Sequence, residues 1–212
     1  MDIHTTINTR KTIRHFDGKP IESEIVEKLL DAGFKAPANG SMRNWEFVIV
    51  NDKDIRMKLL TGVKESVPGT EDEIIKNIES WGLTDKKQKD MYLDAVPKQY
   101  SMLYNAGCLI LPFFRQESPL LQPDTLSSLN GFASIWCCIE NILLAAAAEG
   151  IFGVTRIPQG NETEHIKNII GHPDNYVMPC YLALGYPSQD VKVLPRKEIS
   201  ITDRIHFNLW SK

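Results

Sequence analysis

Three cationic side chains lie within five residues near the amino terminus. They are Arg10, Lys11 and Arg14, and the hydroxyl of Thr12 lies between them. Guanidinium groups bind a phosphate through two parallel hydrogen bonds, and a hydroxyl adds a further donor. This segment therefore has the chemistry of a site for an anionic ligand. The alternative is a basic turn that is merely solvated. For this segment taken alone, the solvated turn is the favoured interpretation.

Two other segments offer polar groups for binding. Arg196-Lys197 follows Pro195 near the carboxyl terminus, and a phosphate held from both ends of the chain would need such a pair. The run from Ala36 to Trp45 contains amides and small residues after a predicted helix end, which suits the polar edge of a planar heterocycle. The alternatives are solvated surface for the basic pair and a plain helix-to-strand loop for the run.

Other chemistries find little support in the residue pattern. Gly150 and Gly153 precede Arg156, but no G-x-G-x-x-G follows a strand and no G-x-x-x-x-G-K-[ST] occurs. A nicotinamide would therefore have to come and go as a substrate. The sequence contains no G-x-S-x-G motif, so nothing in it indicates a serine hydrolase. The histidines are scattered singly and the cysteines form no C-x-x-C pair, so the sequence predicts buried structural cysteines rather than a metal site or thiol redox motif.

The totals are those of an ordinary soluble protein. Of 212 residues, 42% are hydrophobic and 24% are charged, and the formal net charge is -3. This balance gives no electrostatic reason to expect nucleic acid or an anionic membrane as a partner. Met1 to His4 does not resemble a signal peptide, and the apolar stretch Ile135 to Ala148 falls short of the roughly 20 residues that a membrane span needs. We therefore expect a cytoplasmic protein.

Helical periodicity indicates several helices that must position these groups. A long one, from Asp124 or Thr125 to about Glu149, is apolar nearly all round and is predicted to be a core helix. Thr70 and Glu73 form a capping-box pattern ahead of another. The other helices are expected near Ile3 to Ile7, from about Glu22 to Phe34, from Asp52 through Val63, within the polar stretch Gly82 to Tyr104, and from Glu162 to Ile170 with Gly171 as the stop. The charges of the polar stretch, Lys86-Lys87 and Lys89-Asp90 among them, are expected on the surface.

Compact apolar runs bounded by polar residues predict buried strands. These runs are Trp45 to Val50, Cys108 to Phe114, Ile151 to Arg156, and Tyr176 to Gly185. Strands and helices follow one another irregularly. An α+β fold is therefore favoured over a regular alternating α/β fold.

With these segments in their order, the sequence resembles the nitroreductase family of flavin enzymes. Thr9 to Phe16 is similar to the family's R-R-S-I-R-x-F, and Ala36 to Val50 is similar to its A-P-S-x-x-N-x-Q-P-W-x-F-x-V. Asn141 to Gly150 resembles N-L-L-L-A-A-x-x-x-G, and the closing motifs A-L-G-Y-P and P-R-K resemble Leu184 to Pro187 and Pro195 to Lys197. The likeness spans nearly the whole chain.

The resemblance implies an α+β fold with a central, mainly antiparallel sheet flanked by helices, built as an intertwined homodimer with two flavins at the subunit interface. Residues 1–212 would form a single domain that binds FMN. Within it, residues of about 62–104 would form a variable lid over the site.

The resemblance also assigns residues to the flavin. Contacts with the ribityl phosphate and the pyrimidine side are assigned to Arg10, Lys11, Thr12 and Arg14, and completion of the phosphate site to Arg196 and Lys197. Contacts from the other subunit are assigned to Pro37, Ala38, Asn39 and Ser41. Backbone around Arg156 and Ile157 would face the isoalloxazine. The chain departs from the family pattern at Ala38, Ser41, Arg43 and Asn44, where the family usually has Ser, Asn, Gln and Pro, and Arg156-Ile157-Pro158 differs from the common W-I-G-G.

The implied activity is that of an FMN-dependent oxidoreductase. Electrons would pass by a ping-pong mechanism from NAD(P)H to a small acceptor such as a nitroaromatic or a quinone, with flavin N5 as the reactive atom and no catalytic side chain singled out. Alternatives that keep the fold are reductive dehalogenation, enoate reduction, flavin breakdown and non-catalytic flavin binding. A simple interaction domain with basic surface clusters is a further alternative.

Overall fold

An antiparallel sheet forms the centre of the molecule. The computed structural model describes residues 2–67, 69–191, 193–195 and 198–210. Within them the strand order is β1-β2-β5-β3, with β4 beside β2, and the pairings are antiparallel. The strands are β1 (Trp45–Ile49), β2 (Cys108–Arg115), β3 (Phe152–Arg156), β4 (Tyr176–Val177) and β5 (Tyr181–Gly185). The predicted α+β fold with an antiparallel sheet and helices is confirmed.

The run Tyr176 to Gly185, predicted as one strand, forms two. β4 pairs with the carboxyl-terminal end of β2 at Phe114, whereas β5 pairs with the first half of β2, up to Ile110. Pro179 lies between the two strands and has no N–H to donate to a ladder. The sequence prediction missed the break because the apolar pattern continues through it.

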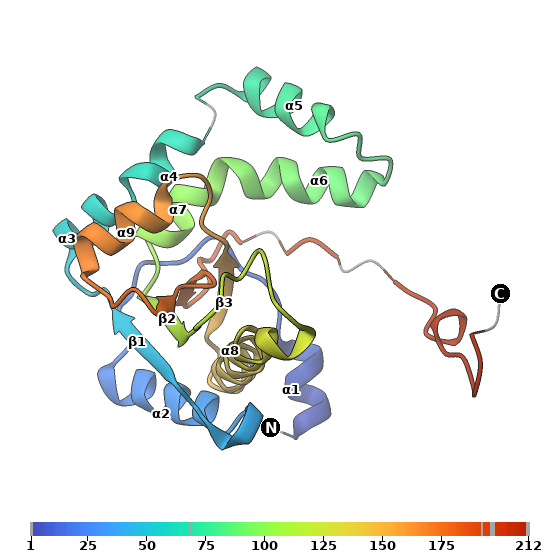
Figure 1. Cartoon of the computed structure of the whole chain (residues 1–212). Coiled ribbons are helices and arrows are strands. Elements are labelled where there is room, and N and C mark those ends of the chain that lie inside the picture. Colours follow the sequence, from blue (N-terminus) through green and yellow to red (C-terminus); the bar gives the residue numbers. More distant parts are fainter. Residues whose placement is uncertain (1, 68, 192, 196–197, 211–212) are drawn as a thin grey trace.

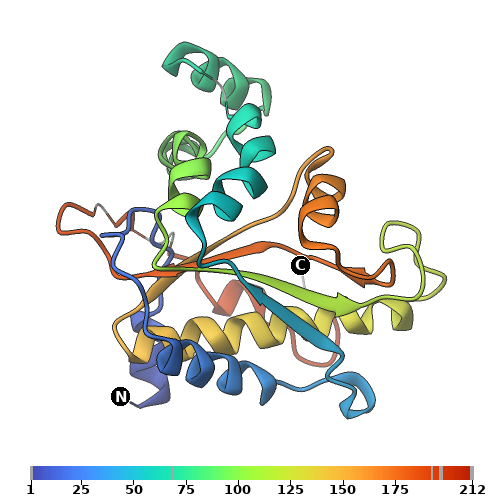
Figure 2. The same cartoon turned by 90° about the vertical axis from the view of Figure 1, so that its left-hand side faces the viewer.

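Side chains of the central strands alternate between two layers of helices, as the period of two in a strand requires. From β2, Ile110 and Phe114 pack with one layer and Leu109 and Leu111 with the other. The first layer consists of α2 (Ser23–Phe34) and α8 (Asn130–Ala148), and the second of α3 (Lys53–Leu59), α4 (Thr61–Ser66), α7 (Gln99–Tyr104) and α9 (Glu162–Ile170). Figure 2 shows the sheet between the layers. Burial on both faces explains why β2 is apolar along nearly its whole length.

α2 and α8 approach each other closely because α2 has a glycine at the contact. A Cβ added to Gly33 would lie 2.8 Å from Cγ1 of Ile142 and 2.9 Å from Sγ of Cys138. α8 is thereby held against α2 and the sheet by its Ile135, Cys138 and Ile142 face. A larger residue at position 33 would force the two helices apart.

The opposite face of α8 is less covered than the prediction of a core helix implied. Ala133, Cys137 and Ala148 are exposed and Leu144 is half-buried. The prediction of buried cysteines holds for the other three and is wrong for Cys137, which lies on this face. Together with the preceding turn, the segment Leu126–Ala148 is long and apolar enough by length and composition to cross a membrane, but here one side of it packs in the core.

The helix expected from Asp52 through Val63 bends at Leu60 and divides into α3 and α4. The buried side chain of Arg56 fixes α3 to the sheet. Its Nε donates to the Val50 carbonyl at 3.1 Å, and its Nη1 donates to the Ala106 carbonyl at 2.7 Å. The guanidinium therefore joins α3 to the chain on either side of the β1–β2 pair.

α5 (Glu71–Ser80) and α6 (Lys86–Ala95) stand apart from the two layers (Figure 1). The predicted capping box is present: Glu73 N donates to Thr70 Oγ1 at 3.3 Å, and Thr70 N donates to Glu73 Oε2 at 3.0 Å. The helices bury a small cluster of their own around Ile74, Ile78 and Val96, separate from the two large clusters on the sheet.

The two ends of the chain lie on the outside. α1 (Ile3–Thr9) is capped by Asp2, whose side chain accepts from the backbone N–H groups of His4 and Thr5. Ser188 still lies against the body, where its N donates to the His15 carbonyl, and Val191 packs on the core, whereas residues 198–210 lie away from the body (Figure 1). Phe207 and Trp210 near its end are 83% and 86% exposed. Short 3₁₀ turns complete the described elements: η1 (Asn39–Ser41), η2 (Val96–Lys98), η3 (Leu126–Leu129) and η4 (Thr202–Arg204).

Candidate functional site

A cavity of about 740 Å³ lies between the amino-terminal basic segment, α6 and the start of the carboxyl-terminal tail. Its volume is within the range of about 300–1,000 Å³ typical of small-molecule sites. The lining residues from the basic segment are Arg10, Lys11, Thr12, Arg14 and His15, those from the α6 region are Asp85, Lys87, Gln88, Met91, Asp94 and Lys98, and those from the tail include Asp190, Val191 and Pro195. Four residues predicted to bind a phosphate and a flavin ring therefore line one cavity.

The basic segment is fixed to the sheet although it is not itself a strand. Thr12 forms a parallel bridge with Gly153 of β3, and Ile13 N donates to the Gly153 carbonyl at 3.3 Å. On the other side, Ser188 N donates to the His15 carbonyl at 3.1 Å. Ile13 is buried in the core, which leaves its neighbour Arg14 directed to the cavity.

The two arginines of this segment are mostly covered and are paired with carboxylates. Arg10 Nε lies 3.3 Å from Glu140 Oε1 of α8, and the Arg10 side chain is 25% exposed. Arg14 Nη1 lies 3.9 Å from Asp94 Oδ2, and the Arg14 side chain is 19% exposed. Burial lowers the pKa of Arg14 and the Asp94 carboxylate opposes that shift, so the guanidinium stays charged. A solvated basic turn does not describe these side chains.

Lys11 contributes a third cation, with its Nζ 5.4 Å from the centre of the Phe152 ring. Two guanidinium groups, an ammonium and the Thr12 hydroxyl at one cavity are the donor set that a phosphate monoester requires. The residues present therefore fit a phosphorylated cofactor such as FMN. Arg196 and Lys197, predicted to complete this site, lie outside the described residues, while Pro195 next to them lines the cavity.

α6 closes the cavity with one face. Lys87, Met91, Asp94 and Lys98 follow the spacing of four, three and four residues that places side chains on one side of a helix. Lys86, Lys87 and Asp90 are exposed and Lys89 is partly covered, in line with the prediction of surface charges, but Lys87 also lines the cavity. Helical spacing groups these side chains on one face, but nothing in the sequence marks that face as the one at the cavity.

The second group of predicted flavin contacts lies elsewhere in the protomer. Asn39 lines a separate cavity of about 260 Å³, which lies where β1 begins and β2 ends. Pro37 and Ser41 are exposed in the same loop and Ala38 is half-buried. Ser41 has a φ of 59°, a left-handed conformation that is uncommon for a residue other than glycine. Within one protomer this group and the basic segment line different cavities.

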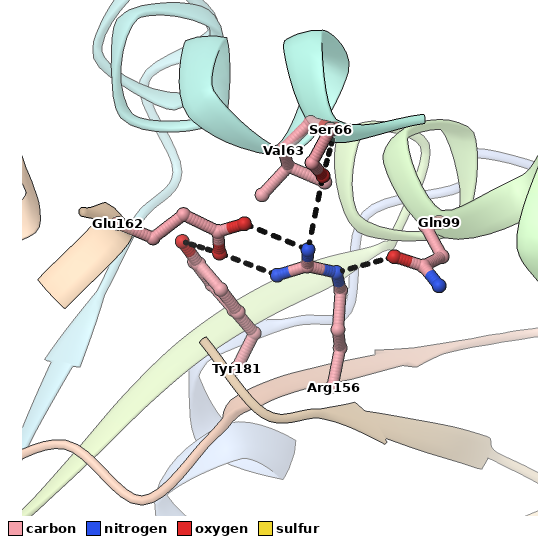
Figure 3. Close-up of polar contacts among 6 residues, drawn as sticks. All are labelled: Val63, Ser66, Gln99, Arg156, Glu162 and Tyr181. Atoms are coloured by element: carbon pink, nitrogen blue, oxygen red, sulfur yellow. Dashed lines mark hydrogen bonds and ion pairs between the residues drawn. The ribbon is translucent and has the colours of Figure 1, made fainter. Parts of the chain in front are cut away.

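Arg156 is buried in a network of polar side chains (Figure 3). Its Nη1 and Nη2 donate to the two carboxylate oxygens of Glu162 at 2.5 and 2.7 Å, and its Nε donates to Gln99 Oε1 at 2.9 Å. Ser66 accepts from Nη2 at 3.3 Å, and the Tyr181 hydroxyl donates to Glu162 at 3.3 Å.

The side chain of Arg156 is therefore fully engaged within the protein. The prediction for this segment is that its backbone faces the flavin ring. The backbone of Arg156 and Ile157 remains able to face a ligand, and the Ile157 side chain is 61% exposed. The role of the Arg156 side chain is not apparent from the sequence. Arg156 lies at the end of β3, whereas the other members of the network lie in the helices α4, α7 and α9 and in the neighbouring strand β5, and no local motif connects them.

No group of three or more His, Cys, Asp or Glu side chains suited to a metal ion occurs among the described residues. Burial raises the pKa of Cys108 to about 11 and that of Cys138 to about 12. These two thiols are therefore protonated at neutral pH and are poor nucleophiles.

Known proteins resemble this chain in sequence and in fold. Residues 7–186 match the model of the nitroreductase family. A putative NADH dehydrogenase/NAD(P)H nitroreductase of Archaeoglobus fulgidus is 25% identical and covers 96% of each chain, and an iodotyrosine deiodinase of Nematostella vectensis is 24% identical over 93% of this chain and 72% of its own. The crystal structure of an oxidised iodotyrosine deiodinase bound to FMN and 3-iodo-L-tyrosine is similar in fold, with a TM-score of 0.73 at 18% identity, over 99% of this chain and 100% of the other.

Proposed function

Because the chain belongs to the nitroreductase family, we propose that it is an FMN-dependent oxidoreductase that transfers electrons from NAD(P)H to a small acceptor such as a nitroaromatic or a quinone. One observation carries the proposal: Arg10, Lys11, Thr12 and Arg14 converge on a single cavity of a size suited to a cofactor. When bound, FMN supplies the two-electron redox chemistry.

The chain's own residues hold and polarise the cofactor in this proposal. Arg10, Lys11 and Thr12 bind the phosphate with charge-assisted hydrogen bonds. Arg14 lies deeper and stabilises negative charge on the pyrimidine side of the ring, an electrostatic effect that is stronger where water is excluded. Backbone near Arg156 and Ile157 lies along the isoalloxazine, and its position is fixed by the buried side-chain network of Arg156.

Within residues 62–104 we assign the role of a lid to α5 and α6, since α4 and α7 at the two ends of this range pack in the second layer of the core. The support is that α6 presents one face to the cavity while α5 and α6 bury a cluster separate from the sheet. A segment attached in this way can move without disturbing either layer of the core. It controls which acceptor reaches the cofactor and keeps water out when it is closed.

The active form in this proposal is a homodimer. Within one protomer the loop Pro37 to Ser41 is remote from the basic segment, and a second copy brings it to the flavin. Apolar side chains available for such an interface include Ile3 and Ile7 of α1 and Phe207 and Trp210 of the tail, all of them exposed in the protomer. The exposed face of α8 adds Ala133 and Cys137.

The test is the absorbance of the purified protein followed through one catalytic cycle. We expect a yellow protein that bleaches when NADH or NADPH is added anaerobically and regains its colour when a nitroaromatic or a quinone is added. Glucose added in place of the acceptor is the control and leaves the protein bleached. A protein that retains FMN but is bleached by neither nicotinamide would contradict the proposed activity.

Reductive dehalogenation is a second candidate, supported by the similarity to iodotyrosine deiodinases over nearly the whole chain. The polar face of α6 at the cavity suits a small acceptor that carries charged groups better than a plain hydrocarbon ring. Release of iodide from 3-iodo-L-tyrosine by the dithionite-reduced protein, compared with reduction of a nitroaromatic under the same conditions, decides between the two candidates.

A further inference from the structure

α6, a helix of the proposed lid, contacts the basic segment through Arg14. Arg14 Nη1 lies 3.9 Å from Asp94 Oδ2, and Arg14 Nη2 lies 3.6 Å from the sulfur of Met91. Asp94 also forms an ion pair with Lys98, one helical turn further along. All three charged side chains line the cavity and are mostly covered, so their charges are only partly screened by water.

Asp94 lowers the net positive charge on one wall of the cavity. Arg14 and Lys98 together bring two positive charges to this wall, and Asp94 offsets one of them. An anionic ligand beside Arg14 therefore experiences a weaker attraction than the two cations alone would exert. The carboxylate belongs to the lid, whereas Arg14 belongs to the segment fixed to the sheet.

We propose that Asp94 is a positioning residue through which the lid sets how much of the positive charge of Arg14 acts on a flavin in the cavity. This inference rests on the proposed FMN site. A reduced flavin carries more negative charge than an oxidised one, so the contact between Asp94 and Arg14 weakens binding of reduced FMN more than binding of oxidised FMN. When the lid is closed, the contact makes the bound cofactor a stronger electron donor. When α6 moves away, the full charge of Arg14 holds the electrons on the flavin.

The experiment compares the affinities of oxidised and dithionite-reduced FMN for the cofactor-free full-length protein by anaerobic titration. Asp94→Asn removes the charge and keeps the size of the side chain. Asp90→Asn is the matched control, since Asp90 lies one turn earlier on α6 and pairs with Lys86 at 2.7 Å, away from the cavity. Asp94→Glu retains the charge.

For Asp94→Asn we expect the ratio of the dissociation constants of oxidised and reduced FMN to rise by roughly three- to tenfold, as one charge near a protein surface would produce. A tenfold rise corresponds to an increase of about 30 mV in the two-electron midpoint potential. Asp90→Asn and Asp94→Glu keep the wild-type ratio. In an Arg14→Gln background, Asp94→Asn should change the ratio less than in the wild type, because the guanidinium that the carboxylate offsets is gone and only Lys98 remains paired with it.

An unchanged ratio in Asp94→Asn, an equal change in Asp90→Asn, or an undiminished change in the Arg14→Gln background would each overturn the role of Asp94. These results leave the proposed function intact as long as the wild-type protein binds FMN. A wild-type protein that binds neither form of FMN would instead remove the proposed function, and this inference with it.

Discussion

At the scale of single residues, the site is distinguished by partly buried cations held by the sheet. Arg10 and Arg14 would be costly to cover without counter-charges, and each has a carboxylate partner, Glu140 and Asp94 respectively. These pairings hold the guanidinium groups at the cavity before any ligand arrives. Pre-organised donors of this kind bind an anion without the entropic cost of ordering long side chains.

Replacement of Arg10 and Arg196 together by Ala tests the phosphate site. Charge-assisted hydrogen bonds contribute about 1.5–3 kcal/mol each, so we expect FMN to bind at least about 100-fold more weakly. Riboflavin, which lacks the phosphate, should lose much less affinity. Fluorescence titration of the cofactor-free protein measures both. Arg204→Ala, an exposed arginine of the tail, is the control and should bind both flavins as the wild type does. Equal losses for FMN and riboflavin would show that the cluster does not bind the phosphate.

At the scale of elements, the buried Arg156 joins parts of the chain that no local motif connects. Its guanidinium links the end of β3 to the beginning of α9 through Glu162, to α7 through Gln99 and to α4 through Ser66. The base of the proposed lid is thereby attached to the sheet beside Ile157, where the flavin ring is expected. The network thus has a structural role that supports the site without contacting the ligand.

Glu162→Gln tests this network. It leaves the Arg156 guanidinium buried without a counter-charge, and removal of one partner of a buried ion pair costs about 3–5 kcal/mol. For a chain of this length the melting temperature should fall by roughly 6–20 °C. Calorimetry at a fixed excess of FMN measures the effect.

Glu117→Gln is the matched control, because the Arg115–Glu117 pair is exposed and should contribute about 0–1 kcal/mol. Replacement of both Arg156 and Glu162 by apolar residues should be less damaging than Glu162→Gln alone, since no uncompensated charge remains. A double variant that is less stable than the single variant would contradict this account.

Much of the element order could be predicted from the sequence. Helices with clear local signals were placed well: the capping box of Thr70 and Glu73 begins α5, and Gly171, with a φ of 72°, ends α9 at the predicted residue. The break at Leu60 was not predicted, because it arises from how the chain packs on the sheet. The break in the last strand coincides with Pro179, but the apolar pattern continues through that residue and predicted one strand.

The site was predictable in part for the same reason. The cluster Arg10 to Arg14 is dense enough to be noticed in the sequence, and the structure places all four of its predicted ligands at one cavity. The contribution of Asp94 was not predicted, since it depends on a helix some eighty residues away folding back over the basic segment. Charges on a polar helix give no sign in the sequence of which of them face a cavity.

At the scale of the whole molecule, the protomer leaves large apolar side chains in water. Phe207 and Trp210 are 83% and 86% exposed in a tail that lies away from the body (Figure 1). The outer face of α8 exposes Ala133 and Cys137. Exposed apolar surface of this extent is typical of a protein–protein interface. It supports the proposed homodimer, in which the second copy covers these side chains.

Replacement of Phe207 and Trp210 together by Ala should destabilise the dimer while leaving the fold of the protomer unchanged. Each side chain is almost fully exposed in the protomer, so its loss has no effect on the core. If the partner covers them, burial of large aromatic side chains contributes about 1.5–3 kcal/mol each, and the dimer dissociation constant should rise about 100-fold or more. Analytical ultracentrifugation measures it, and Met57→Ala, an exposed residue of α3, is the control. A dimer of unchanged strength would show that the tail does not form the interface.

Cys137 provides a chemical probe of the same assembly. It is the exposed thiol among the four, all of which lie within the described residues. In a monomer, iodoacetamide should modify Cys137 rapidly and leave Cys108 untouched, because burial raises the pKa of Cys108 to about 11. In the proposed dimer Cys137 should react slowly at high protein concentration and faster upon dilution. Mass spectrometry of tryptic peptides follows each site, and a rate independent of protein concentration would place α8 outside the interface.

The separate cluster of Ile74, Ile78 and Val96 has a consequence for how this architecture can diversify. Because α5 and α6 form their own miniature core, a different segment can be grafted between α4 and α7 without rebuilding the sheet beneath. The part that binds the cofactor and the part that selects the electron acceptor can then change independently. A new acceptor requires only that α5 and α6 be replaced.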